Sequence, residues 1–144
     1  MQQSSEVRDA VVQFYERLSA GDVEGTSAAI ASDEGAFAIG TQRMGTGRAA
    51  WLESVRENAA AGIVFEAGPI RAWALGDAGW AVDEPTIILP DGTRVPTRMT
   101  AVLRREADGV FRLLHQHYSF AVPDEVGVVS ATAWREQLSA PTAA

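Results

Sequence analysis

Residues 93–120, TRVPTRMTAVLRREADGVFRLLHQHYSF, decide the fold because they contain two long strand patterns separated by one turn. Apolar and polar residues alternate on both sides of Asp108-Gly109, and this dipeptide favours a two-residue hairpin turn. The preceding stretch, GWAVDEPTIIL at 79–89, leads into a second such turn at Asp91-Gly92. The sequence therefore predicts three consecutive antiparallel strands with one face buried.

The register of these strands follows if both turns contain two residues. Glu84 then lies opposite Met99, Met99 lies opposite Tyr118, and Ala101 lies opposite Gln116. Because alternate residues of a strand share a face, these side chains are expected on the inner side of the sheet. A one-residue bulge in the last strand would exchange its two faces. The predicted inner face contains Trp80, Val82, Glu84, Thr86, Ile88, Val95, Thr97, Met99, Ala101, Leu103, Leu114, Gln116 and Tyr118.

The segment before these strands predicts three helices. Apolar residues recur at helical spacing between Val7 and Leu18, Asp22 can cap a shorter helix through about Ala31, and residues 48–62 form a third helical pattern. Strand patterns follow directly, with no internal repeat and no long linker. The expected fold class is α+β, with three N-terminal helices packed on one face of a strongly curved antiparallel sheet.

Composition excludes several kinds of protein. The 144 residues carry a formal net charge of -7, which repels nucleic-acid phosphates and anionic lipids, so neither is expected as a partner. The absence of cysteine excludes disulfides, thiolate nucleophiles and cysteine-based metal sites. The first residues lack the basic and apolar regions of a secretion signal, and no apolar run approaches the length of a membrane span. We therefore expect a cytoplasmic protein.

The order of these elements, together with two segments, resembles a known superfamily. The segments are VVQFYERLSAGDVEGTSAAIASDEG at 11–35 and RLLHQHYSFAVPDE at 112–125. The chain is similar to the NTF2-like superfamily, and specifically to its SnoaL-like branch. The resemblance implies a cone-shaped domain over residues 1–125 with a pocket between the sheet and the helices. It supplies no activity, because this superfamily hosts unrelated functions.

The resemblance also implies a homodimer that pairs through the outer sheet face. The outward residues of the predicted strands there include His115, His117 and Arg98. Residues 126–144 extend past the family pattern. Trp134 and Leu138, spaced i, i+4 in this extension, predict a short helix that could cover a sheet edge or the pocket mouth, followed by a frayed tail. An extension without structure is the alternative.

The ketosteroid isomerases of this superfamily allow a residue-by-residue comparison. Their oxyanion-binding tyrosine matches Tyr15. Their general-base aspartate falls near Ala38 and their protonated aspartic acid falls on Ala101, so both acids of that mechanism are missing. The same alignment places Glu84 and Gln116 on the pocket side. The resemblance therefore argues against isomerase chemistry by that machinery.

Glu84 and Tyr118 form a predicted acid/base pair on the two sides of Met99, roughly 10 Å apart across three strands. Burial would raise the pKa of the glutamate toward neutrality, as a general acid or base requires. Tyr118 or Tyr15 could then donate to a developing oxyanion. The alternative is a solvated or arginine-paired Glu84, with both tyrosines as core residues whose hydroxyls are satisfied. Further residues expected to bind the substrate are Phe14, Trp51, Trp80, Thr86, Thr97, Met99, Ala101 and Gln116.

His115 and His117 share one face of the last strand and lie about 6.8 Å apart. They could share a weakly bound metal ion if the carboxylate of Asp83 joined them. The interpretation that we favour is hydrogen bonding across the outer face or at a dimer interface. The sequence contains no phosphate-binding loop and no nucleophile elbow. We therefore expect neither a metal nor a cofactor.

Two functions remain open at this point. The first is a cofactor-independent acid/base enzyme, namely a cyclase, isomerase, dehydratase or hydrolase, that acts on a small apolar metabolite. The second is a non-catalytic ligand-binding or dimerisation module. The missing pair of pocket acids favours the second function, whereas the isolated inward glutamate and the polar lining favour the first.

Overall fold

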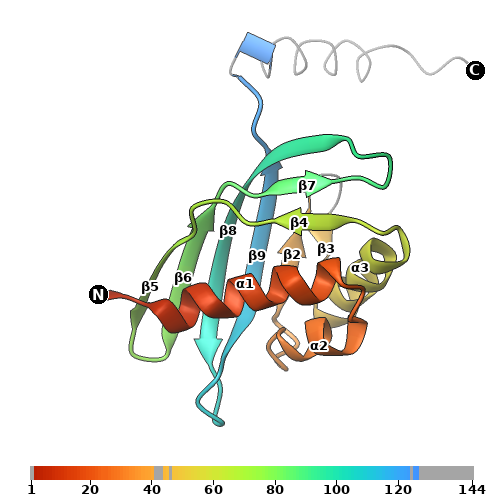
Figure 1. The fold of residues 1–144 in the computed structure, drawn as a ribbon. Helices are drawn as coiled ribbons and strands as arrows, with labels where there is room; N and C mark the ends of the chain where they lie inside the picture. The colour runs from red at the N-terminus through yellow and green to blue at the C-terminus, as the bar shows by residue number, and fades with distance from the viewer. Residues whose placement is uncertain (1, 41–43, 46, 124, 127–144) are drawn as a thin grey trace, which may run out of the picture.

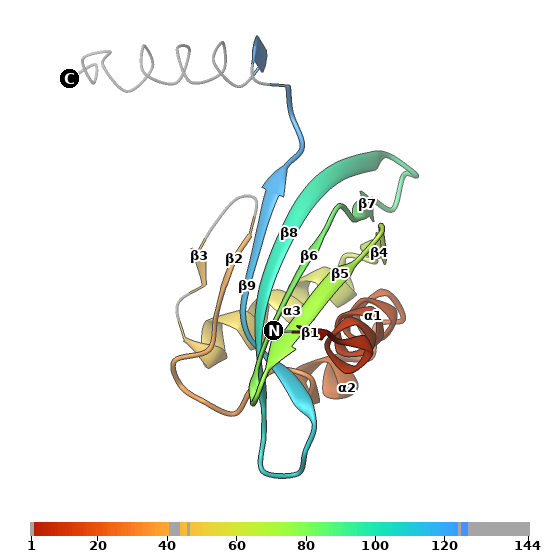
Figure 2. The same ribbon diagram turned by 90° about the vertical axis from the view of Figure 1, so that its left-hand side faces the viewer.

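The computed structural model describes residues 2–40, 44–45, 47–123 and 125–126. These residues form a curved sheet with three helices against one face, so the predicted α+β class is confirmed (Figures 1 and 2). The helices are α1 (Ser5–Ser19), α2 (Val23–Ala28) and α3 (Arg48–Ala60). The strands are β1 (Gln2–Gln3), β2 (Phe37–Ile39), β3 (Met44–Gly45), β4 (Val64–Glu66), β5 (Arg71–Leu75), β6 (Ala78–Asp83), β7 (Thr86–Ile88), β8 (Arg94–Arg105) and β9 (Phe111–Phe120).

β8 is the strand that connects the two parts of the sheet. The main path runs β1-β5-β6-β8-β9-β2-β3, while the start of β8 pairs with β7, which in turn pairs with β4. Every described strand pair is antiparallel except β2 with β9. Figure 2 shows that β8 curves as it passes from β6 to β7. The predicted C-terminal extension lies almost entirely outside the described residues.

α1 anchors the helical layer on the sheet. Ser4 is its N-cap, and the Ser4 hydroxyl accepts a hydrogen bond from the Val7 N–H at 3.2 Å. The apolar residues recur every three or four positions, which gives the helix one apolar stripe. That stripe packs against β5, β6 and β9 as well as β4. Its buried residues are Val7, Val11, Phe14, Tyr15 and Leu18.

α3 is held to the rest of the domain by fewer side chains than α1. Its N-cap is Gly47, which has a φ of 81° and makes no side-chain capping hydrogen bond. Arg48 ties the first turn to the segment after α2, because its Nε donates to the Ala31 carbonyl at 3.0 Å. Trp51 and Val55 are the buried residues of the helix. The remainder of α3 therefore depends on little buried apolar surface.

The β7–β8 connection sets a register that the sequence analysis predicted wrongly. The loop contains three residues, 90–92, because the Leu89 N–H donates to the Thr93 carbonyl at 2.9 Å. A two-residue turn would need that hydrogen bond from residue 90, which is Pro90 and has no N–H. As a result, Asp83 rather than Glu84 pairs with Met99. The same shift pairs Ala81 with Ala101 and Gly79 with Leu103, and turns Trp80 and Val82 to the outer face.

The β8–β9 pairing keeps its predicted inner face by a different route. Its loop also contains three residues, 107–109, as the hydrogen bond from the Glu106 N–H to the Val110 carbonyl shows. This loop pairs Leu103 with Leu113. A bulge between Val102 and Leu103 then inserts one residue into β9, so that Val102 pairs with His115. Beyond the bulge the predicted register returns, with Met99 opposite Tyr118. The prediction of Leu114 opposite Leu103 is wrong, whereas the inward positions of Tyr118 and Gln116 are confirmed.

Gly79 lies where α1 approaches β6. A Cβ at this position would lie 2.6 Å from Val7 Cγ2 and 3.2 Å from Phe111 Cε1. We predict that Gly79→Ala lowers the free energy of unfolding by about 1–3 kcal/mol, because the added methyl overpacks this contact. Urea unfolding followed by circular dichroism measures the change. Ala78→Val at the neighbouring exposed position is the control, and equal losses in both variants would contradict the close approach.

Candidate functional site

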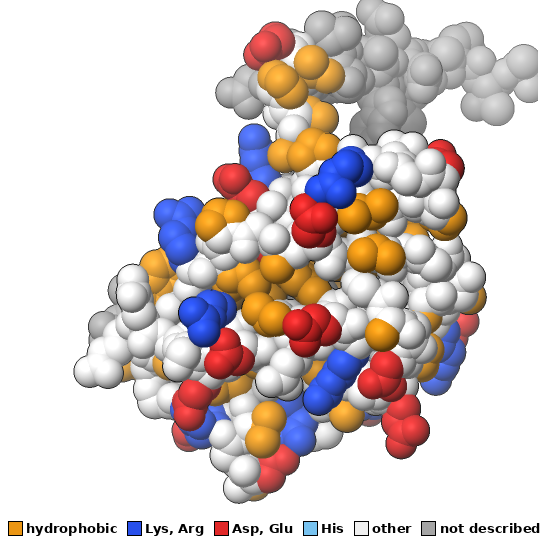
Figure 3. All heavy atoms as spheres, viewed as in Figure 1, with side chains coloured by type: hydrophobic (Ala, Val, Ile, Leu, Met, Phe, Trp, Pro, Cys, Tyr) orange, Lys and Arg blue, Asp and Glu red, His pale blue; other side chains and the backbone are white. Residues whose placement is uncertain are grey.

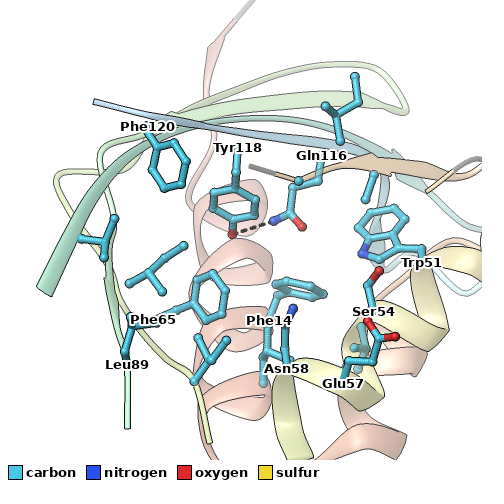
Figure 4. A pocket seen from close by; sticks show the side chains of 18 residues that line it. Phe14, Trp51, Ser54, Glu57, Asn58, Phe65, Leu89, Gln116, Tyr118 and Phe120 are labelled. Atoms are coloured by element: carbon cyan, nitrogen blue, oxygen red, sulfur yellow. Dashed lines mark hydrogen bonds between the residues drawn. The ribbon is translucent and has the colours of Figure 1, made fainter. Parts of the chain in front are cut away.

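A cavity of about 550 Å³ lies between the sheet and the helices, at the end where α3, β4 and β7 meet (Figure 4). In the space-filling view, hydrophobic side chains gather in the middle of the face that carries α1, surrounded by charged side chains (Figure 3). The cavity is lined by Phe14, Leu18, Ala38, Ile39, Gly40, Trp51, Ser54, Val55, Glu57, Asn58, Ile63, Phe65, Ile87, Leu89, Val95, Gln116, Tyr118 and Phe120.

Aromatic side chains from four elements contribute to the walls, together with aliphatic ones. Phe14 comes from α1, Trp51 from α3, Phe65 from β4 and Phe120 from the end of β9. The ring centroids of Phe14 and Trp51 lie 6.4 Å apart, and those of Phe65 and Tyr118 lie 5.6 Å apart. These distances are typical of tilted aromatic pairs. The walls therefore suit a ligand with flat or alicyclic apolar surface.

One end of the cavity is polar because Gln116 and Tyr118 point into it from β9 (Figure 4). Gln116 Nε2 donates a hydrogen bond to the Tyr118 hydroxyl oxygen at 3.0 Å, and both side chains are buried. The bond fixes the two groups relative to each other. A ligand that reaches this end meets the amide oxygen of Gln116 and the phenol of Tyr118.

The opposite wall is polar as well and belongs to α3. Ser54, Glu57 and Asn58 are spaced i, i+3 and i+4, so they share one face of the helix. All three line the cavity, and Figure 4 shows them across the cavity from Tyr118. Glu57 is exposed, which places its carboxylate at the mouth. The cavity thus has polar groups on two facing walls and apolar groups between them.

A buried carboxyl lies behind the cavity wall. Asp83 is 5% exposed, and its Oδ2 accepts a hydrogen bond from the Gly68 N–H at 3.3 Å. The Tyr15 hydroxyl interacts with both the Asp83 carboxyl and the Tyr118 hydroxyl. However, neither the Tyr15 hydroxyl nor Asp83 Oδ1 has a hydrogen-bond partner at good geometry. Burial is the largest influence on all three groups, and it raises the pKa of Asp83, Tyr15 and Tyr118.

The structure separates the predicted catalytic residues. Tyr118 lines the cavity, whereas Tyr15 is buried behind it. Glu84 is exposed, so its predicted inward position is wrong, for the register reason given above. The carboxyl that faces the tyrosines is that of its neighbour Asp83.

The predicted substrate-binding residues divide in the same way. Those that line the cavity are Phe14, Trp51 and Gln116. Those that are buried elsewhere on the inner face are Thr97, Met99 and Ala101. Thr86 is half-buried but does not line the cavity. Trp80 stacks on Trp73 on the outer face, with ring centroids 6.2 Å apart, so its expected place in the pocket is wrong.

Phe65 and the polar face of α3 were not predicted as parts of the site, and Asp83 was expected on the outer face with the histidines. The signal for the helix face was present in the spacing, because Ser54 lies three residues after Trp51, and Glu57 and Asn58 lie three and four residues after Ser54. Phe65 carried no such signal, because its strand is only three residues long.

The two histidines stay apart from Asp83. His115 lies on the outer face against Phe37, with ring centroids 4.3 Å apart, whereas Asp83 points inward. Burial lowers the pKa of His115. Within the described part of the chain, no cluster of three or more histidine, aspartate or glutamate side chains is placed to hold a metal ion. The described residues also contain no helix that is both long and apolar enough to cross a membrane.

Residues 7–123 match the family model of the SnoaL-like domain, so the chain belongs to the SnoaL-like domain family. This match confirms the resemblance and covers both the aromatic cavity and the buried Asp83. Comparison with curated protein sequences finds no match.

Solved structures share the fold. A proposed dehydratase of the NTF2-like family from Streptomyces avermitilis is 23% identical, with a TM-score of 0.75 over 82% of this chain and 95% of that one. An NTF2-like protein of unknown function from Pseudomonas putida KT2440 is 20% identical, with a TM-score of 0.73 over 87% and 94%. A proposed ketosteroid isomerase from Shewanella frigidimarina is 17% identical, with a TM-score of 0.69 over 81% and 96%. At these identities the likeness establishes the fold alone.

Asp83→Asn tests the energetic effect of the buried carboxyl. Because burial raises the pKa of Asp83 in the folded protein, the unfolded chain releases the proton first as the pH rises. Below both pKa values the carboxyl is protonated in both states and brings no penalty, whereas above them the folded state holds a buried charge. We predict that the variant becomes increasingly more stable than the wild type from about pH 4 upward, until the folded-state pKa is passed.

Urea unfolding at a series of pH values measures this difference. Glu84→Gln removes a carboxyl from the next, exposed position and is the matched control, for which we expect no such increase. Parallel pH profiles for Asp83→Asn and the wild type would show that Asp83 is not desolvated in the folded state.

Proposed function

We propose that this SnoaL-like domain binds a small, mainly apolar metabolite with polar groups at two ends. The observation that carries the proposal is the aromatic cavity of about 550 Å³, which has Gln116 and Tyr118 at one wall and Ser54, Glu57 and Asn58 at the facing wall. This volume lies within the range of small-molecule sites. The apolar middle would supply affinity, and the two polar walls would select the ligand and fix its orientation.

An acid/base activity is the second candidate function, and the placement of Glu57 favours it. A cofactor-independent cyclase, isomerase, dehydratase or hydrolase needs one group that moves a proton and one that stabilises developing negative charge. Glu57 and Tyr118 line the same cavity from facing walls (Figure 4). In this proposal, Tyr118 donates to the oxygen of the substrate and Glu57 exchanges the proton. A binding protein without turnover would need neither role.

Filling the cavity tests the binding proposal. We predict that Asn58→Trp abolishes the binding of apolar fluorescent ligands, because the indole would occupy space next to Phe14 and Trp51. Ala60→Trp adds the same side chain at an exposed position of α3 and is the control. Fluorescence titration gives the affinities, and native mass spectrometry detects a ligand that copurifies with the wild type. Equal affinities in both variants would place the binding site outside this cavity.

The second part of the proposal concerns assembly. We propose that two copies pair through the outer sheet face, as expected from the sequence. Paired residues on five strands form one row there, which consists of Trp73, Trp80, Val102, His115 and Phe37. The two indoles stack with an interplanar angle of 20°, and Val102 is 41% exposed. A mainly apolar row of this kind, with one histidine, suits a symmetric interface between identical faces.

Charge placed in this row should separate the copies. We predict that Trp80→Glu converts the protein to a monomer, because the symmetry of the interface would bury the new carboxylate twice. Analytical ultracentrifugation measures the mass in solution. Val110→Glu, at an exposed position directly before β9, is the control and should keep the wild-type mass. A wild type that is already monomeric would overturn the assembly proposal and leave the cavity proposal intact.

A further inference from the structure

The polar end of the cavity is connected to the buried Asp83. Asp83, Met99 and Tyr118 lie opposite one another on three adjacent strands, and Tyr15 comes down on this row from α1. The Tyr15 hydroxyl lies within electrostatic reach of the groups at both ends of the row, Asp83 and Tyr118. The Tyr15 hydroxyl and Asp83 Oδ1 are both buried without a hydrogen-bond partner of good geometry. Gln116 adds the last member, because its amide donates to the Tyr118 oxygen at 3.0 Å. A series of polar groups therefore leads from a buried carboxyl to the cavity.

The surroundings of Asp83 leave one carboxyl oxygen for this series. Oδ2 faces the connection between β4 and β5, where the Gly68 N–H donates to it. A Cβ on Gly68 would lie 2.8 Å from Oδ1 and 2.5 Å from the Glu84 carbonyl, so only glycine permits this approach. From α1 the carboxyl faces Tyr15, from β9 it faces Tyr118, and from β8 it faces Met99. Along its own chain its neighbour Glu84 is exposed and carries the nearby negative charge.

The Tyr15 hydroxyl and Asp83 Oδ1 are each free to take up a partner, and the direction of the hydrogen bonds that the series would then form depends on where the protons are. If Asp83 is ionised, its Oδ1 accepts the proton of the Tyr15 hydroxyl, and the Tyr15 oxygen then accepts the proton of Tyr118. Tyr118 uses its only proton inside the protein and presents lone pairs to the cavity. Tyr118 then offers only acceptors to the cavity.

Protonation of Asp83 reverses this direction. The Asp83 hydroxyl donates to the Tyr15 oxygen, and Tyr15 donates to the Tyr118 oxygen, which also accepts from Gln116. The Tyr118 proton then has no acceptor inside the series and points into the cavity. The polar end then contains a donor.

We propose that Asp83 is a positioning residue whose protonation state decides whether Tyr118 donates to a ligand or accepts from it, so that protonated Asp83 selects ligands with a carbonyl oxygen at this end of the cavity. The inference rests on the proposed binding function and assigns the ligand chemistry of the Gln116–Tyr118 wall. Asp83 does not line the cavity and acts only through Tyr15. The raised pKa of Asp83 brings its proton closer to neutral pH than that of an ordinary aspartate.

Asp83→Asn replaces the carboxyl by an amide, which can donate a hydrogen bond to Tyr15 but cannot ionise. The Gly68 N–H requires an acceptor at the Oδ2 position, so the amide oxygen takes that place and the NH₂ group faces Tyr15. The variant therefore holds the donor direction at every pH. Tyr118→Phe removes the group that faces the ligand, and Glu84→Gln changes an exposed carboxyl at the adjacent position.

The experiment measures the affinity of prodan, a fluorescent naphthalene ketone, between about pH 4 and pH 9. Dimethylaminonaphthalene, which lacks the ketone, is the matched probe. Because the protonated state binds the ketone, affinity is highest below the pKa of Asp83 and falls as the pH rises through it. The expected fall is roughly two- to tenfold for one hydrogen bond, with none for the probe without the ketone. The Glu84→Gln protein should keep the wild-type profile.

Three results would support the proposal together: a flat, tight profile for Asp83→Asn, a flat, weak profile for Tyr118→Phe, and a fall in the wild type only with the ketone. A pH-dependent fall that persists in Asp83→Asn, or that appears with both probes, would overturn it while the cavity function stands. If neither probe binds, the proposed function fails, and carbon NMR of the free protein decides the inference. The inference is supported if the chemical shift of the Tyr118 ring carbons changes with pH at the same midpoint as that of the Asp83 carboxyl carbon. It is refuted if the Tyr118 chemical shift does not change as Asp83 titrates.

Discussion

The hydrogen bond from the Leu89 N–H to the Thr93 carbonyl sets the register on which the inner layer of the protein depends. Pro90 cannot donate, so the pairing begins one residue earlier and the loop holds three residues. Every inward residue of β6 follows from this one bond. The resulting register places Gly79 against α1 and turns Asp83 toward the two tyrosines. Glu84 remains exposed to solvent. A proline in a loop thus decides which carboxyl is buried.

The two hairpins explain how far the sequence could predict this fold. Helical spacing in α1 and strand alternation around Met99 are strong local signals, so the layers, the family and the inner face of β9 were predicted correctly. Both Asp-Gly turns close three-residue loops in which glycine takes a positive φ, of 83° at Gly92 and 81° at Gly109. A bulge compensates for the extra residue beside Leu103, and no equivalent bulge follows Gly92. Dipeptide chemistry does not distinguish these outcomes, although the missing N–H of Pro90 did indicate one of them.

The candidate site shows a similar division. Gln116 and Tyr118 were predicted because long strands carry a clear period, and Phe14 and Trp51 lie on amphipathic helices. Phe65 lies on a strand of three residues, where no period can be read. The register error assigned Asp83 to the outer face, whereas the observed register places it on the inner face opposite Met99. The cavity volume depends on how far α3 stands from the sheet, which follows from packing across the whole domain rather than from any local pattern.

The unequal anchoring of α1 and α3 gives the cavity two walls of different stiffness. α1 is capped by Ser4 and buries five side chains, whereas α3 begins at an uncapped glycine and buries two. Segments with little buried surface open at lower free energy than the rest of a fold. A ligand would therefore meet a firm surface at Phe14 and β9 and a compliant one at α3. Such a site would be selective for one end of a ligand and would tolerate variation at the other end. This would suit the binding of a set of related compounds.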